Sequence, residues 1–237
     1  MPDALAAHAD DHGHGHAHVH AHHPAHAHHF ETMEQQQEAA TLGMWIFLVT
    51  EVLFFGGLFM AYTLYRIWYP EAWSEGSEEL DILLGGINTA VLIGSSLTMA
   101  FAVRSAQVGA KKQLTATWLV LTMLLGLTFL VIKFFEYKHK YDLGHIPGPN
   151  FHFEGPHAAQ VEIFISLYFA MTGLHALHMI IGFGIMSTIL WMTLKGRFSP
   201  QWYTPVELAG LYWHFVDIVW IFLFPLLYLV DRAHQVV

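Results

Sequence analysis

Five long apolar stretches constrain this 237-residue chain more than any other feature of its sequence. About 20 consecutive apolar residues are enough for a helix to cross the roughly 30 Å hydrocarbon layer of a membrane. The stretches run approximately 42–65, 82–106, 114–136, 161–193 and 207–230. The fourth exceeds the required length, so we expect it to tilt or to project beyond the bilayer. The sequence therefore predicts an all-α polytopic membrane protein with a bundle of five transmembrane helices.

The composition agrees with a membrane protein and excludes several other classes. Only 12% of the residues are charged, against about 25% in ordinary soluble domains. The net charge of −9 argues against a nucleic-acid partner, which requires a basic surface. The chain has no cysteine, so it has no disulfide, thiolate metal site or cysteine nucleophile.

The N-terminal segment has a different character from the rest of the chain. Eleven histidines lie between His8 and His29, many of them separated by one residue. Such a segment cannot bury a core, so we expect a disordered cytoplasmic tail over residues 1–38 and a five-helix domain over residues 39–237. Three interpretations stay open for the tail: a solvated low-complexity segment, a proton buffer, or a copper or zinc buffer. The alternating histidines would be its metal ligands: His12, His14, His16, His18 and His20.

The distribution of basic residues predicts the orientation of the chain. With the N-terminus inside, each side of the membrane has five Lys or Arg residues, but the two inner loops are short and almost purely basic. Inner loops carry an excess of Lys and Arg. We therefore expect a cytoplasmic N-terminus and an outer C-terminus.

Glu51 is a lone carboxylate in the first apolar stretch, near the expected middle of the membrane. Its helical neighbours three and four positions away are leucine and phenylalanine, so its own helix offers no cation. Burial then favours the neutral acid. Its role is open between a clasp that joins two helices and a functional group.

Three further pairs of polar residues share the helical spacing of three. His175 and His178 lie in the fourth stretch, and His214 and Asp217 lie in the fifth. The third pair, Lys133 and Glu136, lies near the outer end of the third stretch, where the lysine is expected to snorkel toward water.

Three interpretations compete for the histidines. They could ligate a haem, because Gly173, Ala176 and Gly182 would let a porphyrin approach. They could form part of a divalent-metal transporter, although His178 and Asp217 are expected at different depths. In the third interpretation they form hydrogen bonds between helices, with Asp217 a partner for one of them.

Five segments resemble, in order, the last five helices of subunit III of the haem–copper cytochrome c oxidases. These segments are TEVLFFGGLFMAY, GINTAVLIGSSLTMAFA, LLGLTFLVIKFFEY, FAMTGLHALHMIIG and LYWHFVDIVWIFLFPLLYL. The resemblance covers about residues 40–231. It implies a subunit without a redox centre of its own, which stabilises the catalytic subunit, holds phospholipid in a cleft, and supports oxygen access or proton uptake.

The resemblance also implies partners and functional residues. Haem and copper would lie in a catalytic subunit I and a copper-bearing subunit II, with small subunits and with cytochrome c or another electron donor as further partners. Glu51 corresponds to the family's buried glutamate at the lipid cleft. The family motifs also include Glu136, His175, His178, His214 and Asp217. We expect no catalytic, cofactor-binding or metal-binding residue in this chain outside the histidine-rich tail.

Two departures from the family pattern matter. Longer members have two more N-terminal helices, which form the opposite wall of the lipid cleft and are replaced here by the histidine-rich tail. The segment KGRFSPQWYTPVE also differs from the usual basic form, although Lys195 and Arg197 could hold lipid phosphates.

The sequence thus predicts a subunit of a respiratory oxidase in a bacterial inner membrane, active only as part of its complex. Two alternatives remain: an accessory subunit of a quinol oxidase or nitric oxide reductase, and a divalent-metal transporter.

Overall fold

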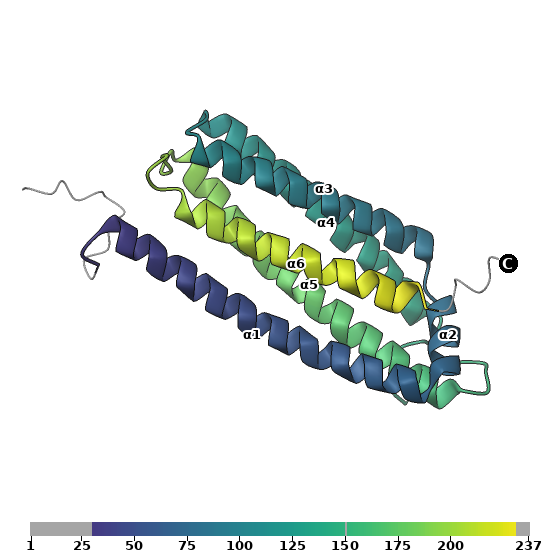
Figure 1. The fold of residues 1–237 in the computed structure, drawn as a ribbon. Coiled ribbons are helices and arrows are strands. Elements are labelled where there is room, and N and C mark those ends of the chain that lie inside the picture. The colour runs from purple at the N-terminus through teal and green to yellow at the C-terminus, as the bar shows by residue number, and fades with distance from the viewer. Residues whose placement is uncertain (1–29, 150, 231–237) are drawn as a thin grey trace, which may run out of the picture.

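The computed structural model describes residues 30–149 and 151–230, and this part of the chain is helical apart from its loops (Figure 1). Its helices are α1 (Met33–Trp68), α2 (Pro70–Glu78), α3 (Ile82–Gln107), α4 (Lys112–Asp142), α5 (Ala158–Leu194) and α6 (Thr204–Tyr228). All except α2 are long and apolar enough to cross a membrane. The predicted all-α architecture with five spans is therefore confirmed.

The helix boundaries follow from short polar and proline signals. The Thr32 hydroxyl accepts a hydrogen bond from the Gln35 amide, and the Asp81 carboxylate accepts from the amides of Leu83 and Leu84. These side chains satisfy amide groups that the first turn of a helix leaves without partners. Gly109 joins α3 to α4 with a φ of 67°, a conformation that side chains with a Cβ rarely adopt.

The five long helices run roughly along one axis, with α6 in the middle of the bundle (Figure 1). The hairpin of α3 and α4 packs on one side of α6, and α1 lies on the other side, against α5 and α6. In the most apolar window of each helix, 50% of the α6 residues are buried but only 11% of those in α1. The first helix is therefore peripheral, and most of its apolar surface faces outward.

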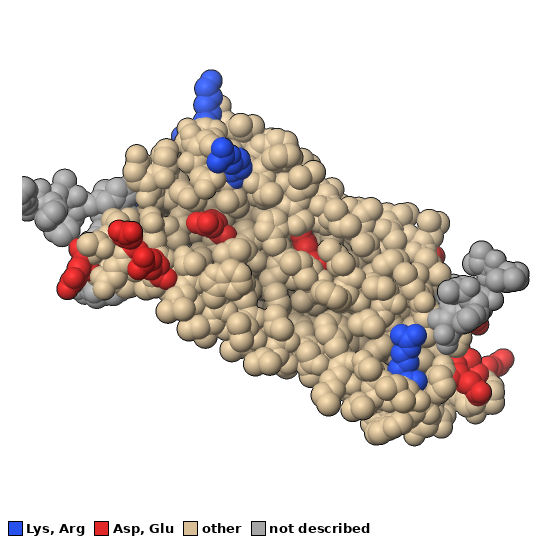
Figure 2. All heavy atoms as spheres, viewed as in Figure 1, with Lys and Arg blue, Asp and Glu red and all other residues tan. Residues whose placement is uncertain are grey.

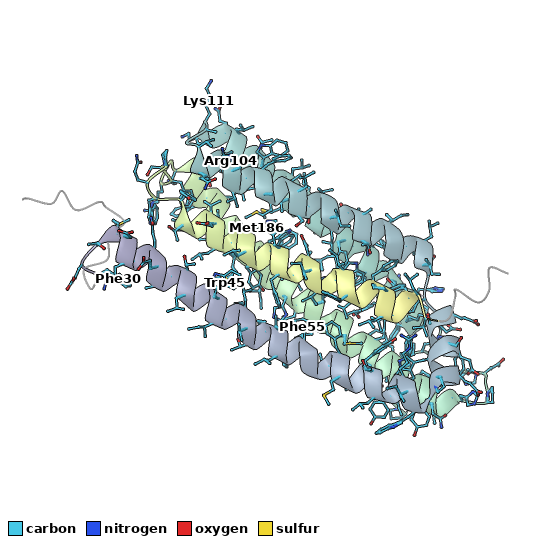
Figure 3. All side chains as sticks on the ribbon, in the orientation of Figure 1. Phe30, Trp45, Phe55, Arg104, Lys111 and Met186 are labelled. Atoms are coloured by element: carbon cyan, nitrogen blue, oxygen red, sulfur yellow. The ribbon has the colours of Figure 1, made fainter. Side chains whose placement is uncertain are left out.

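Charged side chains gather near the two ends of the bundle (Figure 2). The Lys111 end contains the turn after α3 and the loop after α5, and Arg104 and Lys111 lie there (Figure 3). The α2 end contains α2 and residues 143–157. Between these ends the surface is mainly apolar, as expected for a face in contact with lipid.

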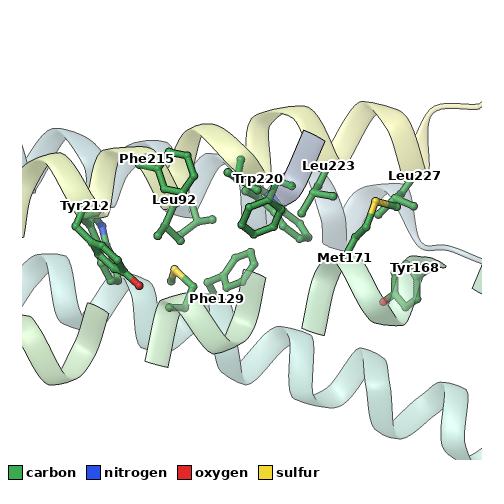
Figure 4. Close-up of a cluster of buried hydrophobic side chains, with 14 of the residues drawn as sticks. Leu92, Phe129, Tyr168, Met171, Tyr212, Phe215, Trp220, Leu223 and Leu227 are labelled. Atoms are coloured by element: carbon green, nitrogen blue, oxygen red, sulfur yellow. The ribbon is translucent and has the colours of Figure 1, made fainter. Parts of the chain in front are cut away.

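Aromatic and aliphatic side chains fill the core between the helices (Figure 4). Trp213 of α6 packs against Gly126 of α4 and Gly182 of α5, where an added Cβ would lie within 3 Å of the indole ring. These two glycines let three helices approach the same tryptophan. The space beside Gly182, which the haem interpretation reserved for a porphyrin, is therefore filled by the protein itself.

Two features differ from the sequence-based expectation. The short helix α2 was not predicted, because its apolar residues are too few for a span and its glutamates suggest a loop. The first helix begins at Met33, so residues 33–38 are helical and continue directly into the first apolar stretch. Residues 1–29, including the five candidate metal-binding histidines, lie outside the described residues, and the division into two domains stays a prediction.

Candidate functional site

Glu51 meets His178 between α1 and α5. The Glu51 Oε2 atom lies 3.1 Å from His178 Nε2, and the two side chains are 18% and 10% exposed. Glu51 is 18 residues from the start of α1 and 17 from its end, which places it about 26 Å from either end. The neighbours of Glu51 in its own helix offer it no polar partner. His178 supplies one from a helix that is distant in sequence.

Hydrogen bonding indicates how the proton of this pair is held. His178 Nδ1 lies 2.9 Å from the carbonyl oxygen of Leu174, which can only accept, so Nδ1 must carry a hydrogen. A neutral His178 therefore has a bare Nε2, and Glu51 must be protonated to donate to it. A protonated His178 instead donates from Nε2 to an ionised Glu51. In both arrangements one proton lies between the two residues and the pair has no net charge, as a low-dielectric membrane favours.

Aromatic residues enclose the pair on the protein side. The Phe55 ring lies 5.3 Å from the His178 ring, and the Tyr212 hydroxyl donates to the His178 carbonyl oxygen at 3.0 Å. Tyr212 also stacks on Phe47 at 6.1 Å. The site is thus a hydrogen-bonded carboxyl–imidazole pair on the flank formed by α1 and α5, enclosed by aromatic rings but still partly exposed.

Glu136 belongs to a separate, closed network near the α2 end. Lys133 Nζ donates to Glu136 Oε2 at 3.0 Å and to the hydroxyls of Tyr168 and Tyr228 at 2.9 Å each. Both hydroxyls in turn donate to Glu136 Oε1, at 2.8 and 2.5 Å. All three ammonium hydrogens therefore have acceptors inside the bundle. Lys133 is 4% exposed, so the prediction that it snorkels toward water was wrong.

His175 does not form the predicted hydrogen bond between helices. Its ring lies 5.3 Å from Phe129 and 5.2 Å from Trp220, and neither ring nitrogen has a partner among the described residues. Three residues turn an α-helix by about 300°, so the side chains of His175 and His178 diverge by about 60°. His178 consequently reaches α1, whereas His175 points into the aromatic core.

His214 and Asp217 lie together between α6 and α3. His214 Nδ1 is 2.6 Å from the Ser96 hydroxyl of α3, which confirms one predicted contact between helices. Asp217 is 3% exposed, and its carboxyl interacts with the same Ser96 hydroxyl rather than with a histidine. The prediction that Asp217 pairs with a histidine was therefore wrong.

The intramembrane polar residues thus form separate groups rather than one site. The Glu51 pair lies at α1 and α5, the Glu136 network near the α2 end, and Asp217 faces α3. Among the described residues, no group of three or more potential ligands is arranged to hold a metal ion. The geometry gives no support to a transport site shared by these side chains.

Lys195 and Arg197 lie exposed at the Lys111 end of α5. The Lys195 ammonium and the Arg197 guanidinium each lie 5.7 Å from the centre of the Trp191 ring. A tryptophan with adjacent cations is typical of the boundary between lipid tails and headgroups.

The loops at the α2 end contain histidine–carboxylate contacts that the sequence did not indicate. His157 Nδ1 lies 2.9 Å from Glu75 and its Nε2 lies 3.2 Å from Glu71, both on α2. The hydrogen bond to Glu75, together with the charges of both carboxylates, raises the pKa of His157. Burial lowers the pKa of His145, although Glu79 lies 3.1 Å away.

The sequence also gave no reason to select Ser96, Tyr168 or Tyr228. Tyrosines in apolar stretches more often mark a membrane interface, and serine is common where transmembrane helices pack. The spacing of Lys133 and Glu136 was the one signal near the Glu136 network. It placed the two side chains on one helix face but indicated neither their ion pair nor the two hydroxyls that complete the network.

A family model for cytochrome c oxidase subunit III matches residues 19–231. The chain belongs to this family. A cytochrome c oxidase subunit 3 of Thermostichus vulcanus is 33% identical over 195 residues, covering 81% of this chain and 87% of the relative. That of Synechocystis sp. is 36% identical over 192 residues, covering 79% and 74%. The corresponding protein of Corynebacterium diphtheriae is 33% identical over 193 residues, covering 81% and 88%.

These matches confirm the resemblance that the five motifs indicated. The chain is a subunit III of the haem–copper cytochrome c oxidases, and its place in aerobic respiration and electron transport follows from that family. Neither the interpretation as an accessory subunit of a quinol oxidase or nitric oxide reductase nor that as a metal transporter is favoured.

Proposed function

We propose that this subunit III contains no redox centre and serves its oxidase by stabilising the haem–copper catalytic subunit I. Haem and copper then lie in subunit I and a copper-bearing subunit II, small subunits complete the complex, and cytochrome c supplies the electrons. The interior of the chain supports this proposal, because Phe129 and Trp220 surround His175 and Trp213 fills the space beside Gly182.

The observation that carries the functional proposal is the Glu51–His178 pair. It holds one proton in the middle of the membrane, on a flank where most of the α1 surface is exposed. Such a pair becomes charged whenever it loses or gains a proton, unless a second proton moves in the opposite sense at the same time. We infer that it supports proton uptake by the complex and orders lipid beside α1 and α5.

Replacing Glu51 tests this function. The Glu51→Gln variant keeps the shape of a neutral acid and can still hydrogen-bond to His178, but cannot exchange a proton. The purified complex should keep its haem content and initial rate but lose activity faster during sustained turnover. The control is Glu154→Gln, the same chemical change at an exposed loop carboxylate. A Glu51→Gln complex as durable as the wild type would contradict the proposal.

The absence of a redox centre has its own test. The His175→Gln variant should leave the haem absorption spectrum of the purified complex unchanged, because the ring is packed among aromatic side chains and ligates nothing. A lost haem band in a complex that still contains this subunit would show that His175 is an axial ligand.

We propose that the Lys111 end faces the cytoplasm of a bacterial cell and that the α2 end faces outward. Because the chain lacks cysteine, single cysteines can report the sidedness directly. A cysteine at Glu154 should react with an impermeant thiol reagent in intact cells, whereas one at Lys111 should react only after lysis. The reverse pattern would overturn the orientation.

A lipid site at the Lys111 end is a further part of this proposal. Lys195 and Arg197 lie beside Trp191, so their charges can attract a phosphate headgroup while the indole lies at the interface. Replacing both cations with glutamine should lower the phospholipid retained by the purified complex, and the same change at Lys138 and Arg66 should not. Equal retention would argue against this site.

A further inference from the structure

A pocket of about 340 Å³ opens between α3 and α6, midway along the bundle. Asp217 is 13 residues after the start of α6 and 11 before its end, or about 20 and 16 Å along the axis. Figure 2 views this flank, which is largely free of charged side chains between its two ends apart from a small recessed acidic area. The pocket is lined by Leu92, Ile93, Ser96, His214, Asp217, Ile218 and Ile221.

The polar groups of this pocket have unused hydrogen-bonding capacity. The Asp217 carboxyl is 3% exposed, and its hydrogen-bond partner in the described chain is the Ser96 hydroxyl, which also lies 2.6 Å from His214 Nδ1. A buried carboxyl that shares one hydroxyl with a histidine is incompletely hydrogen-bonded, which costs folding free energy in either protonation state. In either state at least one of its oxygens is free to accept a hydrogen bond. Glu136, by contrast, has three hydrogen-bond partners inside the bundle.

The depth and walls of the pocket restrict what can fill it. A phosphate headgroup cannot reach the middle of a bilayer, and lipid tails have no hydrogen-bond donor. The volume is roughly that of eleven waters at about 30 Å³ each. Water would be poorly retained, because the rim residues Ile93, Ile218 and Ile221 are apolar and about half exposed to the membrane.

We propose that the pocket receives a side chain with an N–H or O–H donor from a transmembrane helix of a partner subunit. Its apolar stem would pack against the isoleucine rim, and its polar end would reach the Asp217 carboxyl. The proposal rests on the proposed function, because it requires that this chain be packed in an oxidase complex. It assigns the α3–α6 flank to contact with a partner, whereas the α1–α5 flank with Glu51 is left to lipid.

Photo-crosslinking in the whole complex tests the proposal. A photoreactive amino acid replaces Ile218 at the rim, and in the control it replaces Ile180, which is 58% exposed on α5. The complex is purified through a tag on this chain, and cross-linked peptides are identified by mass spectrometry. The rim probe should cross-link one transmembrane helix of a partner at a fixed position, and the α5 probe should react with lipid. If the rim probe reacts only with lipid while the complex remains intact, the proposal is wrong.

Two variants separate docking from folding. Asp217→Leu removes the acceptor and should weaken retention of this chain in the complex about tenfold in detergent, whereas Asp217→Asn should stay within about threefold. Ile218→Trp fills the pocket from its rim without touching a polar group, and should weaken retention in a folded chain. Wild-type retention of both Asp217→Leu and Ile218→Trp would overturn the proposal. If the unaltered chain purifies with no partner at all, the proposed function fails instead.

Discussion

The Lys133–Glu136 network gives the sharpest stability prediction. Replacing Lys133 with methionine removes three hydrogen bonds and leaves the buried Glu136 without its cation. Hydrogen bonds between transmembrane helices contribute about 0.6 kcal/mol on average and up to about 1.7. Two of the three bonds join α4 to other helices and amount to about 1 to 3 kcal/mol. The third belongs to a buried ion pair within α4, and breaking such a pair by removing one partner costs about 3 to 5 kcal/mol. We therefore expect Lys133→Met to lower the free energy of unfolding by about 3 kcal/mol.

The measurement is reversible unfolding of the purified chain in mixed micelles of a mild and a denaturing detergent. A double variant, Lys133→Met with Glu136→Gln, supplies the control, because it removes both charges and leaves acceptors for Tyr168 and Tyr228. It should recover more than half of the lost stability. A single variant as stable as the wild type, or a double variant no better than the sum of its parts, would refute this account.

Two further predictions concern packing and pH. Gly182→Ala should destabilise the chain by about 1 to 3 kcal/mol, because its Cβ would lie 2.9 Å from the Trp213 ring. The control is Gly184→Ala, whose added Cβ meets nothing within 4 Å and should leave the stability unchanged. Equal effects of the two variants in the same unfolding assay would contradict the packing. Because the contact with Glu75 raises the pKa of His157, its stabilisation should be present below the ordinary value near 6.5 and lost as the pH rises through the raised value. Thermal unfolding midpoints across this range should therefore fall less in His157→Gln than in the wild type, and identical pH dependence would argue against the contact.

The sequence predicted the elements of the fold better than the contacts between them. Apolar length alone located the five spans, because a lipid-facing helix must satisfy its backbone internally. The polar helix α2 has no such constraint. Its position depends on Trp73, which packs against Phe164 of α5, a contact that no local pattern encodes.

The same limit applies to the candidate site. Glu51 was selected from the sequence as an intramembrane carboxylate, but its partner is 127 residues away and depends on how α1 crosses α5. For Lys133, the sequence showed a lysine near a helix end but not the two tyrosine hydroxyls that hold it inside. Residue type indicated where polarity is costly, and only the packing of the helices showed which groups offset that cost.

The central claim is that Glu51 and His178 hold one proton between them. Isotope-edited infrared difference spectra of the complex near pH 7, comparing wild type with Glu51→Gln, isolate the signal of the Glu51 carboxyl. The same comparison is then made in a His178→Leu background. We predict that the Glu51 signal shifts when His178 is removed, because the proton loses one of its two holders. An identical Glu51 signal with and without His178 would contradict the claim.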